Sequence, residues 1–136
     1  MKIQYVEPSY VHMVWDQLAP FLQASLDGGG TYEYTLDQVK VRIIDGTWQV
    51  LVAIDENNQI AGAAALHFFN RPDARVGYIN MMGGRLITGT DEFEQLKVYL
   101  CSQGATYIEA SARESAARLF GRYGLTEKYR VVGAKL

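Results

Sequence analysis

The sequence has little of the material from which disulfides and metal centres are built. Its 136 residues include a single cysteine, Cys101, and two histidines. One cysteine cannot form an intramolecular disulfide, and so few soft ligands leave little with which to hold a metal ion. We therefore expect a protein of the cytoplasm, a reducing compartment, with no metal site.

Long apolar runs and an excess of positive charge are also missing. No apolar stretch approaches the roughly 20 residues of a membrane-spanning helix, and the N-terminus has no apolar signal core. Thirteen Lys and Arg residues stand against fifteen Asp and Glu residues, a net charge of −2. This balance gives no global attraction toward phosphate backbones. We expect a protein that binds neither membranes nor nucleic acid.

The composition that is present is that of a globular protein. Hydrophobic residues make up 49% of the chain and charged residues 21%, which excludes a disordered or fibrous class. A chain of this length buries about two-thirds of the surface that its unfolded form exposes. The sequence therefore predicts one domain over residues 1–136, folded on its own core.

The N-terminal third predicts a strand followed by two helices. Lys2 to Val6 alternates polar and apolar residues, as a short strand does. Apolar residues then recur at helical spacing from Tyr10 to Leu26, with Pro20 expected to kink or split the helix. Thr35 and Gln38 have the spacing of a capping box, which predicts a second, shorter helix directly after them.

The remainder alternates strands and helices. β-branched and apolar runs separated by turn residues predict strands, and apolar residues at helical spacing that end on a glycine predict helices. The predicted strands are Trp48–Ile54, Ile60–Phe69, Arg75–Met82, Thr106–Ala110 and Tyr129–Leu136, and the predicted helices are Asp91–Gln103 and one around Leu119. The order β-α-α-β-β-β-α-β-α-β belongs to the α+β class, a sandwich around one mixed, mostly antiparallel sheet.

The segment from Arg113 to Leu125 carries a family resemblance. Acyl-CoA-dependent acyltransferases of the GNAT superfamily have Asn-x-x-Ala-x-x-Leu-Tyr-x-Lys-x-Gly-Phe here. In this sequence the matching positions are Ala116, Leu119, Arg122, Gly124 and, conservatively, Leu125. Arg113 stands in place of the Asn, and Phe120 in place of a Tyr that often protonates the departing thiolate. The chain resembles a divergent member of this superfamily.

The resemblance covers nearly the whole chain and implies a three-layer α/β/α sandwich that uses acetyl-CoA as acyl donor. In the family the fourth strand bulges and splays from the fifth, and the pantetheine arm of the donor fills the gap. The resemblance places this gap after about Met82 and assigns Asn80, Met81 and Met82 to the pantetheine arm. It also assigns Arg113 and Phe120 to the donor site.

The turn after the fourth strand resembles the family's phosphate-binding loop in a degenerate form. The family has Gln/Arg-x-x-Gly-x-Gly/Ala, whose backbone amides meet the CoA pyrophosphate. This sequence has Arg85 and Gly89, with Thr88 and Thr90 at the two glycine positions. The resemblance assigns these four residues to the phosphates. The alternative is a turn with no ligand.

Four residues are candidates for proton transfer, which an amine acceptor requires. His67 lies in an apolar run, where its alternative role is that of a core histidine with satisfied hydrogen bonds. Glu109 alternates with apolar neighbours on a strand, and its alternative is an ion-paired carboxylate. Tyr123 is nearly one helical turn from the family's tyrosine position, and its alternative is a packing role. Tyr78 is a further candidate.

The resemblance leads to two hypotheses of function. The first is an N-acyltransferase that moves an acetyl group from acetyl-CoA to a primary amine of a small molecule or peptide. Cys101 is expected on the helix after the phosphate loop, away from the thioester, which favours direct attack over a covalent enzyme intermediate. Glu33, between Tyr32 and Tyr34 in the loop that often covers the acceptor site in the family, is a candidate to attract a cationic amine, and its alternative is a solvated loop carboxylate.

The second hypothesis is a catalytically degenerate GNAT-fold protein that serves as a binding or assembly module. Short, divergent chains of this kind are also similar to ones from bacteriophages, so a phage or mobile-element origin stays open. A homodimer is compatible with both hypotheses. Fold alone does not decide between them.

Overall fold

The computed structural model describes residues 1–29 and 33–136. A five-stranded mixed sheet forms its centre, with the strands in the spatial order β1-β2-β3-β4-β5. The elements along the chain are β1 (Lys2–Val6), η1 (Pro8–Tyr10), α1 (Val11–Gly29), α2 (Leu36–Ile44), β2 (Gln49–Ile54), β3 (Ile60–Arg71), β4 (Ala74–Gly84), α3 (Arg85–Thr88), α4 (Thr90–Ser102), β5 (Tyr107–Ala110) and α5 (Glu114–Gly121). The first four strands are antiparallel neighbours, and β5 runs parallel to β4.

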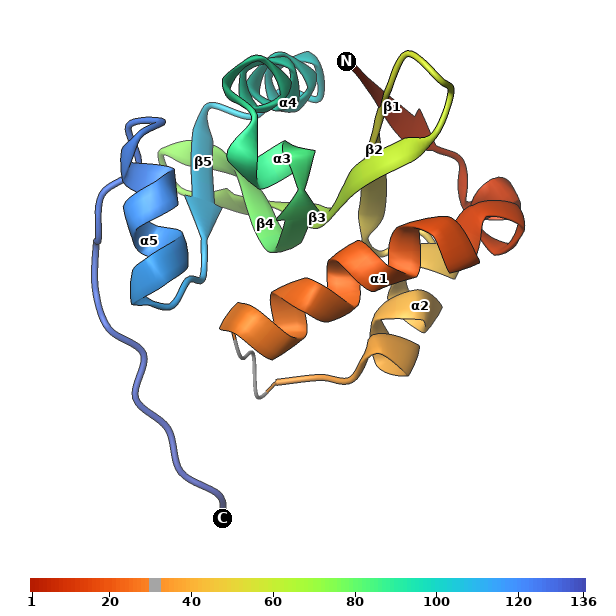
Figure 1. The fold of residues 1–136 in the computed structure, drawn as a ribbon. Helices are drawn as coiled ribbons and strands as arrows, with labels where there is room; N and C mark the ends of the chain where they lie inside the picture. Colours follow the sequence, from red (N-terminus) through yellow and green to blue (C-terminus); the bar gives the residue numbers. More distant parts are fainter. Residues whose placement is uncertain (30–32) are drawn as a thin grey trace.

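Helices cover both faces of the sheet, which confirms the α+β three-layer sandwich. Figure 1 shows α1 and α2 on one face and α3 and α4 on the other. On the first face Leu18 and Leu22 of α1 pack with Val50 of β2 in one core cluster. On the second face Phe93 and Leu96 of α4 belong to the other cluster. Alternate residues of β2 and β3 supply the two clusters, as a pleated strand requires.

In the N-terminal third, the structure confirms the predicted capping box but not the predicted effect of Pro20 on the first helix. Thr35 accepts a hydrogen bond from the backbone of Gln38, and the Gln38 side chain accepts one from the Thr35 backbone, so the capping box is present. Pro20 lies inside α1, which nevertheless runs as one helix of 19 residues to Gly29. The predicted split at Pro20 is therefore wrong. Packing of α1 along the sheet keeps the helix continuous.

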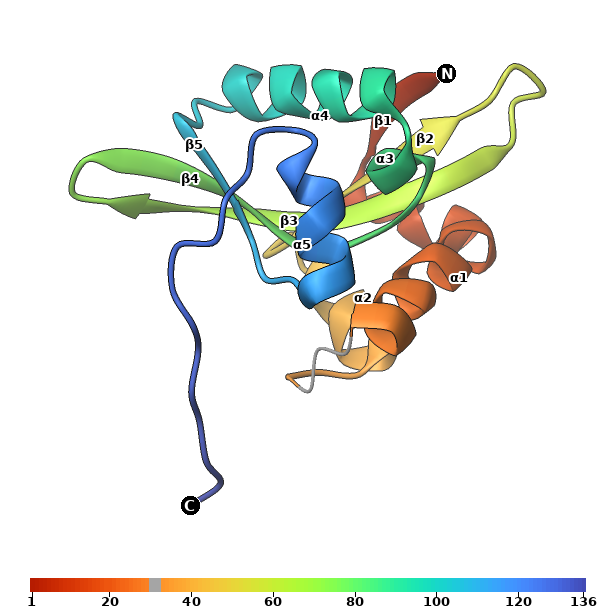
Figure 2. The ribbon, with the colours of Figure 1, turned by 60° about the vertical axis from the view of Figure 1, so that its left-hand side comes forward.

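The predicted C-terminal strand Tyr129–Leu136 is also wrong. Residues 126–136 form an exposed segment outside the sheet, beyond α5 (Figure 2). Val131 and Val132 are 69% and 91% exposed. A strand exists only where a neighbour accepts its hydrogen bonds, and the sheet ends at β5. In the described sheet no strand lies beside residues 129–136, so they do not form one.

Candidate functional site

The candidate site begins where β4 and β5 part. Along β3 and β4, Ala65 pairs with Met81 and the next pair is Leu66 with Ile79. Asn80 is therefore an extra residue, a β-bulge, on β4. Pairing between β4 and β5 stops at Ile79. The split therefore starts after Ile79 rather than after Met82 as predicted, at the point where β5 itself ends with Ala110.

The second half of β4, residues 80–84, continues past this split without β5 beside it. Figure 2 shows β5 crossing β4 at an angle. Met81 and Met82 are 2% and 5% exposed and point to opposite faces of the sheet, each into one of the two core clusters. Only their backbone is therefore available at the strand edge. The Met82 N–H donates to Ser25 Oγ of α1 at 3.2 Å.

Asn80 organises polar contacts at the bulge. Its side chain amide donates to Nδ1 of His67 at 2.8 Å, and its backbone carbonyl accepts from the Tyr34 hydroxyl at 3.2 Å. Burial lowers the pKa of His67 below its ordinary value, and the bond to Asn80 partly opposes this shift. The imidazole is therefore neutral at physiological pH. Asn80 itself is 7% exposed.

Aromatic rings surround His67. The ring of Trp48 stacks on it at 5.9 Å between centroids, and the rings of Phe69 and Tyr78 lie at 5.5 and 5.3 Å. Trp48 also meets Tyr34 edge-on at 5.2 Å. These contacts explain the depressed basicity of His67, because aromatic surface excludes water from a charged imidazolium.

Tyr78 spans the base of the split. Its hydroxyl is hydrogen-bonded to the hydroxyl of Ser111, just beyond the end of β5. Burial raises the pKa of Tyr78, the bond to Ser111 opposes the shift, and the charges of Glu33 and Glu109 add to it. The phenol therefore stays protonated at neutral pH and is a proton donor beside the split.

Glu109 is held by an arginine. Arg71 donates two hydrogen bonds to its carboxylate, at 2.7 and 2.8 Å. The bonds from Arg71 lower the pKa of Glu109 below its ordinary value. This geometry is that of the ion-paired alternative, and it makes Glu109 a weak proton acceptor at neutral pH.

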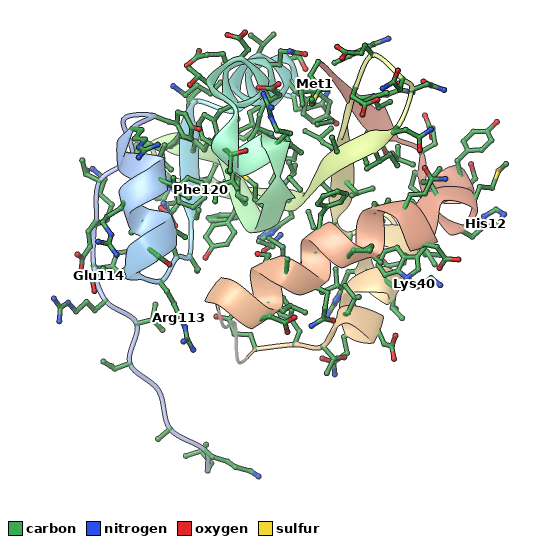
Figure 3. All side chains as sticks on the ribbon, in the orientation of Figure 1. Met1, His12, Lys40, Arg113, Glu114 and Phe120 are labelled. Atoms are coloured by element: carbon green, nitrogen blue, oxygen red, sulfur yellow. The ribbon has the colours of Figure 1, made fainter. Side chains whose placement is uncertain are left out.

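Tyr123 and Phe120 tie α5 to the far side of the split. The Tyr123 ring stacks on Phe93 at 4.1 Å, and its hydroxyl donates to the Ile87 carbonyl at 2.8 Å. Phe120 is 6% exposed and meets Phe93 edge-on at 6.2 Å. Figure 3 shows Phe120 on the sheet side of α5, with Arg113 at the start of the helix. The Tyr123 hydroxyl is thus committed to a backbone carbonyl.

The four predicted phosphate-site residues lie in α3, at its junction with α4 and at the start of α4. Arg85 and Thr88 begin and end α3, and Thr90 begins α4. Gly89 is the N-cap of α4 and provides no capping side chain. The Thr88 hydroxyl donates to the Gly84 carbonyl at 3.3 Å, so it closes the turn.

An open cleft lies beside the loop that precedes α2. It has a volume of about 480 Å³. Its lining includes Glu33, Tyr34, Gln38, Arg42, Asp45 and Trp48. Trp48 is shared with the ring cluster around His67, so the cleft and the split are neighbours. Tyr32, the other aromatic residue predicted for this loop, lies outside the described residues.

The described residues contain no group of three or more His, Cys, Asp or Glu side chains arranged to hold a metal ion. Within the same residues, no helix combines the length and hydropathy of a membrane span. Sequence reasoning missed Ser25, Arg71 and Ser111. Each acts through a partner at least 33 positions away, and no local pattern signals such a contact.

No protein-family model matches this sequence, and no relative is found among curated protein sequences. Solved structures do match over the whole chain. A ribosomal-protein-alanine N-acetyltransferase from Brucella melitensis biovar Abortus 2308 has a TM-score of 0.71 at 12% identity, and the match covers 100% of both chains.

Two further structures are similar. An aminoglycoside acetyltransferase from an uncultured soil metagenomic sample, solved with sisomicin, has a TM-score of 0.71 at 16% identity, covering 99% of this chain and 95% of the other. A predicted acetyltransferase from Clostridium acetobutylicum, solved with acetyl-CoA, has a TM-score of 0.66 at 15% identity, covering 98% and 95%. At such identities the likeness establishes the fold, which is the one expected from the sequence.

Proposed function

We propose that this chain, which has the fold of the GNAT acetyltransferases, moves an acetyl group from acetyl-CoA to a primary amine. The observation that carries the proposal is the bulge at Asn80 with the split that follows Ile79. It leaves residues 80–84 of β4 as an extended edge inside the molecule. An extended ligand that carries amide groups, such as pantetheine, can pair with such an edge as a strand would.

The donor-binding roles follow from position. The backbone of Asn80, Met81 and Met82 would pair with the pantetheine arm, which would replace the Tyr34 hydroxyl at the Asn80 carbonyl and the Ser25 hydroxyl at the Met82 N–H. The turn of Arg85, Thr88, Gly89 and Thr90 lies at one end of this edge. Phe120 of α5 and Arg113, the N-cap of this helix, would border the other side of the split. A structural neighbour solved with acetyl-CoA supports the choice of donor.

The transfer is direct attack. The ammonium group of the acceptor first releases a proton to solvent. The lone pair of the resulting neutral amine attacks the thioester carbonyl, the C–S bond breaks, and the nitrogen loses its second proton as the thiolate leaves. Tyr78, a protonated phenol at the base of the split, is suited to donate to the thiolate. Cys101 is exposed on α4, which supports a route without an acyl-cysteine.

His67 is the proton acceptor that we favour, since its ring is neutral and lies among the aromatic residues beside the split. To accept a proton at Nε2, the His67 ring must carry its hydrogen on Nδ1. The Asn80 side chain would then rotate by half a turn, so that its amide oxygen accepts from Nδ1 instead of its amide nitrogen donating to it. Glu109 and Tyr123 transfer no proton in this scheme. Glu109 is ion-paired with Arg71, and the Tyr123 hydroxyl donates to the Ile87 carbonyl.

The acceptor class is a cationic amine. Carboxylates of Glu33 and Asp45 and the ring of Trp48 line the cleft next to His67. Carboxylates and aromatic faces both attract ammonium groups. A structural neighbour that is an aminoglycoside acetyltransferase, solved with sisomicin, supports a small-molecule amine.

The test is release of free thiol from acetyl-CoA in the presence of a panel of aminoglycosides, polyamines and peptides. We expect His67→Gln to lower turnover by about a hundredfold, the size of a general-base effect. Turnover of the wild type should fall as the pH drops through the His67 pKa, which lies below 6.5. His12→Gln is the matched control, because the other histidine is exposed on α1 and should leave turnover unchanged.

A binding module without turnover is the second candidate function. Phe120 in place of a tyrosine and threonines at both glycine positions of the phosphate turn favour it. It would replace the enzyme proposal if the wild type acetylated no amine of the panel and acetyl-CoA failed to raise its melting temperature.

A further inference from the structure

The proposed proton acceptor and proton donor are register neighbours in the sheet. His67 of β3 pairs with Tyr78 of β4, and Tyr78 in turn pairs with Glu109 of β5. Side chains of paired residues stand on the same face of a sheet, so these three form a row across three strands. Beside this row lies Ser111, the residue directly after β5, whose hydroxyl is hydrogen-bonded to that of Tyr78.

The hydrogen bond between Tyr78 and Ser111 can run in either direction. A phenol and an alcohol each carry one hydroxyl hydrogen, and each also accepts through its oxygen. When Tyr78 donates, its hydrogen is committed to Ser111. When Ser111 donates, the phenolic hydrogen is available to another acceptor. Only the second direction leaves Tyr78 able to give its hydrogen to a thiolate.

The surroundings of Tyr78 oppose a lasting phenolate. Burial and the charges of Glu33 and Glu109 raise the pKa of Tyr78, and the bond to Ser111 opposes this shift. Ser111 is exposed whereas Tyr78 is half-buried, so Ser111 connects the phenol to solvent. The charged and titratable groups on the segments around Tyr78 are His67 and Arg71 on β3, Glu109 on β5, Glu33 before α2 and Tyr129 after α5.

We propose that Ser111 is a positioning residue that frees the Tyr78 hydrogen for the thiolate and returns a proton to Tyr78 afterwards. The inference rests on the proposed function. The phenolic proton moves to the sulfur, the Ser111 hydroxyl proton moves to the phenolate oxygen, and a proton from solvent replaces it on Ser111 Oγ. Since two protons leave the acceptor nitrogen and one is taken up through Ser111, the transfer releases one proton overall.

A double-mutant cycle on acetyl transfer tests this role. We expect Tyr78→Phe to lower kcat by about a hundredfold, the size of a general-acid effect. Ser111→Ala should lower kcat by about tenfold, the rate equivalent of one lost hydrogen bond. Because Ser111 acts through Tyr78, adding Ser111→Ala to Tyr78→Phe should cause no further loss. Ser111→Thr keeps the hydroxyl and should retain kcat within about twofold of the wild type.

A second measurement needs no turnover. In an NMR titration of isotope-labelled tyrosine, with the Tyr78 signal identified by its absence from Tyr78→Phe, the pKa of Tyr78 should be higher in Ser111→Ala than in the wild type. Ser111→Thr should leave it unchanged. An acid is active while protonated, so the alkaline limb of kcat should move to higher pH in Ser111→Ala. Ser102→Ala is the matched control, because this hydroxyl bonds to the Tyr99 carbonyl on α4.

Two results would overturn the inference and leave the proposed function standing. One is a double variant in which the losses from Ser111→Ala and Tyr78→Phe multiply, as they would if Ser111 acted independently of Tyr78. The other is a Ser111→Ala protein with the kcat and the Tyr78 pKa of the wild type. If instead the wild type acetylates no amine of the panel, the proposed function fails and this role fails with it. A raised Tyr78 pKa in Ser111→Ala would then support the hydrogen bond alone.

Discussion

The two halves of β4 belong to one strand but have different neighbours. Residues 76–79 have β3 on one side and β5 on the other, whereas residues 80–84 have only β3. In the first half the strand is a central member of the sheet. In the second half it is an edge inside the protein, and α1 packs against it. The bulge at Asn80 lets one strand serve as scaffold and as candidate binding surface.

Different forces hold the two halves. Across the first half, strand pairing is accompanied by the ion pair of Arg71 with Glu109 and by the bond of Tyr78 with Ser111. The second half depends on α1, through the backbone of Phe21 against Gly83 and the hydroxyl of Ser25 on Met82. We therefore expect substitutions in the second half to have larger effects than the loss of a surface charge pair in the first.

Gly83→Ala has the largest expected effect. A Cβ here would lie 2.3 Å from the Phe21 carbonyl oxygen, a backbone atom that cannot turn aside. We expect the free energy of unfolding to fall by about 3 kcal/mol, measured by urea unfolding. Gly28→Ala is the control, because its Cβ would meet nothing within 4 Å and alanine favours a helix. Equal stability of Gly83→Ala and wild type would mean that α1 does not hold the second half.

Ser25→Ala should have a smaller effect. It removes the acceptor of the Met82 N–H at 3.2 Å, a part-buried bond. We expect a loss of about 1 kcal/mol and faster hydrogen exchange at the Met82 amide. Ser102→Ala removes a hydroxyl that bonds within its own exposed turn, so its stability should stay close to that of the wild type. Unchanged exchange at Met82 would contradict the assignment of this bond.

Glu109→Gln tests the first half and has the smallest expected effect. Because Arg71 lowers the pKa of Glu109, the folded protein binds this proton less tightly than the unfolded chain does. The stabilisation is present above the ordinary value of 4.5 and is lost as the pH falls through the lower folded pKa. We expect a melting temperature about 2–4 °C below that of the wild type at neutral pH. A difference that persisted unchanged into acid would exclude the ion pair as its cause.

The sequence predicts best what is decided locally. The capping box of Thr35 and Gln38 involves residues three positions apart, and it appears as predicted. Strands β2 to β5 were found with their ends shifted by a few residues, because hydrophobic pattern marks a strand well and its end poorly. The strand predicted at Tyr129–Leu136 failed, since its pattern is local and the partner that it needs is not.

The candidate site was predicted less completely than the fold. The resemblance predicted the split. The bulge at Asn80 arises from a shift in strand register just after the pair Ala65 and Met81, and no motif encodes that shift. The partner of Glu109 is 38 positions away, so its ion pair could be named only as an alternative. Glu92 was visible as a negative charge beside the phosphate turn, but its burial against Gly89 is a matter of packing.

The short outer strands of the sheet bear on solubility. β1 and β5 form its two edges and have only five and four residues. Each edge therefore offers few unpaired backbone groups to another sheet, and Lys2 places a charge on the β1 edge. Brevity of this kind opposes edge-to-edge association into fibrils. The remaining edge, at residues 80–84 of β4, lies inside the protein with α1 packed against it.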